Sequence, residues 1–169
     1  KRSWQQRNRI KAVNGELMLT VPVLSKKLFN QNIYDVKIDD TQNFEKKHLN
    51  SIKYNYNKSP FYNVYIDELD QLYNNKFINL SNLNIEIIKW LSLKLGIKTT
   101  FKLSSSLNIK GVKTELLINI CNNLGATHYL SPLGSSEYID KSNLFEKSSI
   151  NLSYQNYIHP VYNQLHGDF

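Results

Sequence analysis

The sequence has a single cysteine, Cys121, among its 169 residues. One thiol cannot form an internal disulfide, which excludes a disulfide-stabilised scaffold and favours a reducing compartment. The sequence also lacks an apolar stretch long enough to span a membrane, because Lys94, Asn119 and Asn122 interrupt its longest apolar clusters. We therefore expect a cytoplasmic protein without a membrane segment, in which Cys121 is a buried structural thiol rather than a nucleophile.

Motifs for metal binding and for a catalytic triad are also missing. The histidines stand at positions 48, 128, 159 and 166, a spacing that matches no zinc pattern, so no metal site is expected. No Ser-His-Asp set can be assembled from spacing alone. His159 and His166, with Asp168 close by, are nevertheless candidates for acid–base catalysis, because histidine titrates near neutral pH. The alternative, a packed surface histidine, is the commoner outcome for such residues.

Basic residues outnumber acidic ones, which gives a net charge of +7. Much of this excess fits a composition rich in Lys, Asn, Ile and Tyr, as AT-rich genomes encode, but residues 1–11 (KRSWQQRNRIK) concentrate it. In a strand, Arg7, Arg9 and Lys11 would project from one face, and arginine can grip a phosphate with two hydrogen bonds. An anionic ligand held by Arg7, Asn8 and Arg9 is one interpretation, and a solvated basic edge is the other. No motif for binding DNA is present, and RNA remains an alternative.

Periodicity predicts an α/β fold. Apolar spacing favours helices over residues 42–57, 61–72, 81–95 and 113–124, and short strands over residues 17–23, 34–38, 99–103, 127–130 and 150–154. This order of elements predicts right-handed crossovers in a largely parallel, Rossmann-like sheet flanked by helices, with a helical insertion between the early and later strands. We expect one α/β domain over residues 1–169.

Polar loops follow two of the predicted strands. Ser104 and Ser105 come directly after strand 99–103, and Gly134 and Ser135 follow strand 127–130. Open α/β sheets bind ligands at the carboxyl ends of their strands, glycine lets a ligand approach the backbone, and serine can donate to phosphate or sugar oxygens. The two loops together predict the walls of a cleft. Taken singly, each is as well explained as a solvated connection.

Three segments resemble the WbqC-like family: KRSWQQRNRIK followed by LTVPV, then GVKTELLINICNNLGATHYLSPLGSSEYID, and finally YIHPVYNQLHGDF. Their order and spacing match over essentially the whole chain. Members of this family carry a further N-terminal segment and continue past the last Phe of this sequence. The resemblance therefore implies that both termini are truncated relative to the family.

The family is associated with bacterial O-antigen and capsule gene clusters. The resemblance implies a transferase of surface-polysaccharide biosynthesis that acts on a nucleotide-linked amino sugar, by acyl or aminoacyl transfer. No cofactor is expected beyond this nucleotide-activated substrate. The expected partner is a nucleotide sugar or another anionic small molecule. The sequence predicts no oligomeric state. The candidate substrate- or phosphate-binding residues are Arg7, Asn8, Arg9, Ser104, Ser105, Gly134, Ser135 and Tyr138. The alternatives are a non-catalytic accessory protein of the same pathway and an RNA-binding module.

Overall fold

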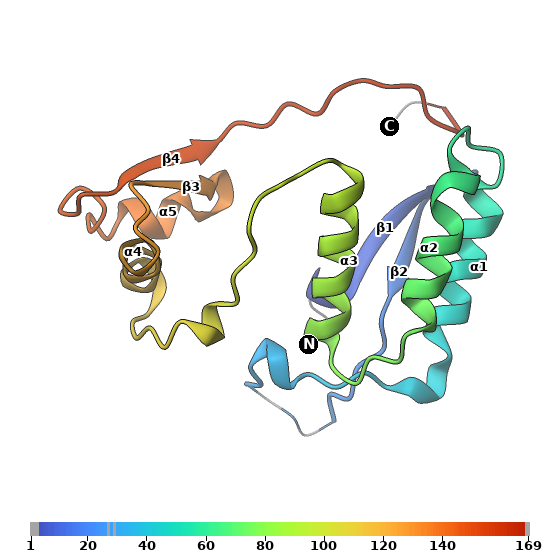
Figure 1. The fold of residues 1–169 in the computed structure, drawn as a ribbon, viewed down its shortest axis with the longest axis horizontal. Coiled ribbons are helices and arrows are strands. Elements are labelled where there is room, and N and C mark those ends of the chain that lie inside the picture. The colour runs from blue at the N-terminus through green and yellow to red at the C-terminus, as the bar shows by residue number, and fades with distance from the viewer. Residues whose placement is uncertain (1–3, 27, 29, 168–169) are drawn as a thin grey trace. The chain divides into compact units, whose positions relative to one another are not determined.

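The structure, a computed structural model, describes residues 4–26, 28 and 30–167. The chain divides into two compact units: residues 1–98 with 161–169 form unit 1, and residues 99–160 form unit 2. Helices and two short sheets make up the described part, so the α/β class is confirmed (Figure 1). The expectation of a single domain stays a prediction.

A β-hairpin opens unit 1. Strands β1 (Arg7–Ala12) and β2 (Gly15–Thr20) pair antiparallel, and Ala12 stands opposite Gly15, which leaves only Val13 and Asn14 in the turn. Gly15 has a φ of 107°, a conformation that residues with a Cβ rarely adopt. A glycine at this position therefore allows the chain to reverse within two residues.

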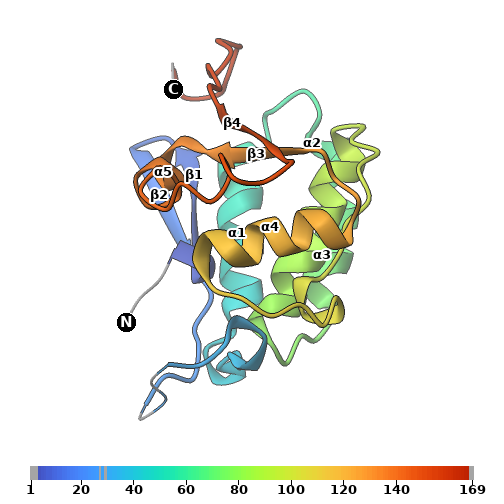
Figure 2. The same cartoon turned by 90° about the vertical axis from the view of Figure 1, so that its left-hand side faces the viewer.

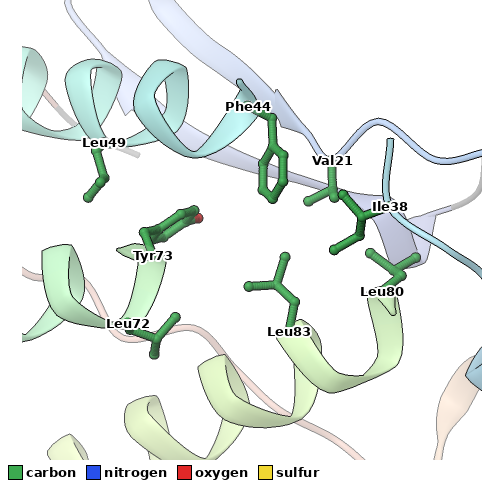
Figure 3. Packing of buried hydrophobic residues seen from close by; sticks show 8 residues of the cluster. All are labelled: Val21, Ile38, Phe44, Leu49, Leu72, Tyr73, Leu80 and Leu83. Atoms are coloured by element: carbon green, nitrogen blue, oxygen red, sulfur yellow. The ribbon is translucent and has the colours of Figure 1, made fainter. Parts of the chain in front are cut away.

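Three helices complete unit 1: α1 (Phe44–Tyr56), α2 (Tyr62–Asn74) and α3 (Leu80–Lys94). They confirm the predicted helices 42–57, 61–72 and 81–95, and each end lies within two residues of its predicted position. Helices α1 and α2 pack side by side, and α1 also contacts β1 (Figure 1). The apolar faces of the three helices meet residues that flank the hairpin in one core, shown in Figure 3, which consists of Val21, Ile38, Phe44, Leu49, Leu72, Tyr73, Leu80 and Leu83.

Unit 2 contains a parallel strand pair. Its elements are α4 (Lys113–Asn123), β3 (His128–Pro132), α5 (Ser136–Asp140) and β4 (Asn151–Gln155). Strands β3 and β4 run parallel, with His128 opposite Asn151. Helices α4 and α5 lie beside this pair (Figure 2) and form a small core with it, made of Cys121, Ile139, Phe145 and Ile150. Burial raises the pKa of the Cys121 thiol, which suits a structural residue rather than a nucleophile.

Short 3-10 turns connect these elements. They are η1 (Trp4–Gln6), η2 (Ile33–Asp35), η3 (Asp40–Gln42), η4 (Ser104–Ser106) and η5 (Leu133–Ser135). None of the helices in the described part of the chain has both the length and the apolar character needed to cross a membrane.

The single, largely parallel Rossmann-like sheet is not confirmed. Strands β1 and β2 pair with each other in an antiparallel sheet, because a turn of two residues can join only antiparallel strands. The predicted strand 34–38 is replaced by η2 and by isolated bridges at Lys37 and Ile38. The predicted strand 99–103 forms no ladder, and its apolar residues Phe101 and Leu103 stay about half exposed, so burial does not favour pairing there.

Candidate functional site

The two candidate arginines of β1 differ in their hydrogen bonds and in their burial. Arg9 Nη1 donates to both carboxylate oxygens of Glu16, at 2.8 and 2.7 Å, on the surface of the hairpin. Arg7 is half-buried, and its Nε is shielded from solvent without a hydrogen-bond partner among the described residues. A buried donor without an acceptor is unfavourable by roughly 1–3 kcal/mol. Arg7 is therefore the residue of this strand that best fits an anionic ligand.

Asn8 does not belong to the same surface as these arginines. Successive side chains of a strand point to opposite faces, so Asn8 lies on the other face of β1 from Arg7 and Arg9. Its Oδ1 accepts a hydrogen bond from the backbone N–H of Arg9 at 2.8 Å. Asn8 therefore makes a local contact with the backbone and lies apart from Arg7 and Arg9, the two arginines of the candidate phosphate grip.

The candidate histidines lie in different units. In unit 1, His166 Nε2 donates to the carbonyl oxygen of Asn55 at 3.0 Å, beside the last turn of α1. In unit 2, His159 packs edge-on against Tyr157, with ring centroids 5.9 Å apart. Asp168 falls outside the described residues. Catalytic roles for these three residues stay predictions.

The strand-end loops of unit 2 carry the remaining candidates. Ser104 and Ser105 are exposed in η4, but no strand precedes them, so the expected pair of neighbouring strand ends is absent. Gly134 and Ser135 form η5 directly after β3, and a Cβ at Gly134 would meet no atom within 4 Å. Open space thus adjoins the Gly134 loop, while a cleft shared with Ser104 and Ser105 stays a prediction.

Tyr138, on α5, neighbours a bonded pair that joins β4 to α5. The hydroxyl of Tyr154 donates to Asp140 Oδ1. Removal from solvent and this bond to Asp140 raise the pKa of Tyr154 to about 12, so its phenol stays protonated at neutral pH. Tyr138 is 42% exposed. The hydroxyl of Tyr154 is thus already committed to Asp140, which leaves Tyr138 as the candidate hydroxyl of α5.

Unit 1 has two pockets that involve α1. One, of about 330 Å³, opens between α1 and α2. The other, of about 240 Å³, lies between β2 and α1 and reaches the buried His48. His48 Nε2 donates to the carbonyl oxygen of Thr20 at 3.1 Å, and its Nδ1 lies 3.4 Å from the hydroxyl of Tyr73. Burial lowers the pKa of His48, which favours the neutral ring.

Comparison with known proteins identifies the family. A model of the WbqC-like protein family matches residues 1–169. The chain belongs to the WbqC-like family. A protein of Mycobacterium tuberculosis, named "Uncharacterized protein Rv1507c", is 34% identical over 171 residues, which covers 100% of this chain and 73% of that protein. No solved structure matches the chain.

Sequence reasoning missed several polar groups of this WbqC-like chain. Asp140 and Tyr154 are far apart in sequence, and only the packing of β4 against α5 brings them together. His48 lies in the predicted helix 42–57, and only the packing of that helix beside β2 places it at a pocket. Among the described residues, no three His, Cys, Asp or Glu side chains are arranged to hold a metal ion.

Proposed function

We propose that the chain is a cytoplasmic transferase of bacterial surface-polysaccharide biosynthesis that acts on a nucleotide-linked amino sugar. The reaction is acyl or aminoacyl transfer: an amide C–N bond forms at the sugar amine, the bond between the acyl group and its activated carrier breaks, and the carrier leaves with the bonding electron pair and the proton that the amine loses. The family resemblance supports the pathway. One observation supports the substrate class, namely the buried, unpartnered Nε of Arg7.

The chemistry of Arg7 favours a phosphate as its ligand. A guanidinium presents parallel N–H groups that match two oxygens of one phosphate, and such charge-assisted bonds are stronger than neutral ones. Nη1 of Arg9 already donates to the Glu16 carboxylate, so Arg9 has fewer N–H groups left to bind a ligand. The diphosphate of a nucleotide sugar would satisfy the orphaned donor of Arg7.

Calorimetric titration with nucleoside diphosphate sugars, beginning with UDP-N-acetylglucosamine, tests the proposal. We expect Arg7→Ala to weaken binding about tenfold or more, which corresponds to about 1.4 kcal/mol, and Arg7→Lys to restore only part of it. Arg9→Ala is the matched control and should change affinity by less than about threefold, because exposed, already paired charges contribute little. Absence of binding by the unmodified chain, or binding indifferent to Arg7→Ala, would refute the phosphate grip.

A titration with RNA at several salt concentrations tests the alternative that the chain is an RNA-binding module. A single-stranded RNA bound through the basic hairpin would lose affinity steeply with rising salt, because phosphate contacts release counterions. RNA binding with such a salt dependence, together with no response to nucleotide sugars, would replace the transferase proposal.

A second candidate function, a non-catalytic accessory protein, is favoured by exposed apolar side chains around the α1–α2 connection. Tyr54 is 76% exposed, Phe61 66% and Val64 59%. Exposed apolar groups that gather in one region often mark protein contacts. An accessory role predicts that Phe61→Ser abolishes association with a pathway enzyme while leaving nucleotide-sugar binding intact; loss of both would point to misfolding instead.

A further inference from the structure

The pocket between α1 and α2 has a polar wall and an apolar floor. Its volume of about 330 Å³ is at the small end for ligand sites, which suits one ring-sized molecule. Its lining consists of Asn43, Glu45, Lys46, Leu49, Asn50, Lys53, Asp70 and Asn74. None of these residues belongs to the candidate phosphate grip on β1, so the pocket needs a separate explanation.

Two charged side chains of the pocket, one on α1 and one on α2, already pair with each other. The ammonium of Lys53 donates to Asp70 Oδ2, and Asn74 Nδ2 donates to Asp70 Oδ1 at 3.1 Å. Of the remaining charged side chains, Glu45 is negative and Lys46 positive. The pocket as a whole is therefore electrically balanced, and a strongly charged ligand such as a phosphate has no net attraction to it.

The amide groups of α1 are available to a ligand. Asn43 lies at the start of α1 without a side-chain capping bond, and neither its side chain nor that of Asn50 bonds to another described residue. A carboxamide can donate and accept at the same time, which matches a hydroxyl group that also does both. The apolar residue of the lining is Leu49, which belongs to the core of unit 1 and exposes 7% of its surface.

We propose that this pocket binds a neutral carbohydrate, as a single pyranose ring. Asn43, Asn50 and Asn74 would exchange hydrogen bonds with ring hydroxyls, and the C–H face of the ring would lie against Leu49. A neutral, hydroxyl-rich ring fits the balanced charge, the open amides and the apolar floor together. This inference does not rest on the nucleotide-sugar proposal, because it uses no residue of β1.

Nuclear magnetic resonance can observe the asparagines directly. The ¹⁵N-labelled chain is titrated with glucose, galactose and N-acetylglucosamine, and the side-chain NH₂ signals are followed alongside the backbone amides. We expect saturable shifts at Asn43, Asn50 and Asn74 with at least one sugar. Inorganic phosphate and glycine serve as charged and zwitterionic comparison ligands and should produce no such shifts.

A pair of asparagine variants tests the assignment. Asn50→Ala removes an exposed pocket amide, and Asn82→Ala removes an exposed amide on α3 that does not line the pocket. Loss of one or two hydrogen bonds should weaken sugar binding by about fivefold to tenfold in Asn50→Ala and leave it unchanged in Asn82→Ala. The proposal is overturned if no sugar shifts the pocket signals, if glycine or phosphate shifts them more, or if both variants bind sugar as the unmodified chain does. Nucleotide-sugar binding through Arg7 can survive each of these outcomes.

Discussion

The two strand pairs of this chain are similar in length but differ in how they are connected. Strands β1 and β2 follow each other through a turn of two residues and run antiparallel. Strands β3 and β4 run parallel and are joined through η5, α5 and the chain up to residue 150. Parallel pairing requires such a crossover, whereas antiparallel pairing needs only a turn. The hairpin therefore depends on local conformation, and the parallel pair on the packing of α4 and α5.

The cores beneath the two pairs differ as well. The core of unit 1 combines side chains from three helices with residues that flank the hairpin. The core of unit 2 is smaller and covers one face of its strands: Tyr129 and Leu152 pack inward, while Leu130 on the other face is 63% exposed. We expect core substitutions in unit 1 to lower stability most, a substitution in the hairpin turn to lower it less, and changes of surface charge to matter least.

The largest effect is expected from Leu83→Ala. Leu83 is 1% exposed in the core of unit 1, and its truncation should lower the free energy of unfolding of that unit by about 2–5 kcal/mol, through lost burial and a new cavity. Urea denaturation followed by circular dichroism measures the change. Leu93→Ala, on the same helix but 71% exposed, is the matched control and should stay within about 0.5 kcal/mol. Equal effects of the two variants would contradict the assigned core.

The hairpin turn provides the next largest effect. Gly15 has a φ of 107°, so Gly15→Ala should destabilise unit 1 by about 1–2 kcal/mol. Gly134, which follows β3, has neither a positive φ nor a neighbouring atom in the path of a Cβ, so Gly134→Ala should leave stability nearly unchanged. Thermal denaturation of both variants compares the two connections. A larger loss in Gly134→Ala than in Gly15→Ala would mean that the parallel pair, and not the hairpin, depends on its glycine.

Whether a feature of the fold or of the candidate site could be predicted from the sequence depends on whether residues close together in the chain determine it. The four long helices followed from apolar spacing, because that spacing reports on residues close together in the sequence. The segment 99–103 has strand-like composition, yet a strand also needs a partner, and the sequence cannot name one. The same limit applied to the candidate site: the ion pair of Arg9 depends on Glu16 across the hairpin, and the shielding of Arg7 Nε and the Tyr154–Asp140 bond depend on packing.

A smaller, pH-dependent effect is expected from His48 in unit 1. Burial lowers its pKa from the ordinary value of 6.5, so above pH 6.5 both the folded and the unfolded states hold a neutral ring. Below pH 6.5 the unfolded state takes up a proton that the folded state resists, and the free energy of unfolding falls until the lowered pKa is reached. Urea denaturation from about pH 5 to about pH 8, the range in which histidine titrates, should show this fall. The fall in the free energy of unfolding should disappear in His48→Gln and persist in His128→Gln, a variant in unit 2. The opposite result would show that the titrating histidine is His128, in the parallel pair, and not His48.

The smallest effect is expected from Glu16→Gln, which breaks the ion pair with Arg9 across the hairpin. Both side chains are about 60% exposed, and exposed ion pairs contribute roughly 0–1 kcal/mol, so the free energy of unfolding should change by less than that of Gly15→Ala. The same variant releases Arg9 for a ligand. If Arg7 alone grips the phosphate, nucleotide-sugar affinity stays the same; if the released Arg9 joins it, affinity rises. A loss of stability above about 2 kcal/mol would show that charge, rather than the turn and the core, holds the antiparallel pair together.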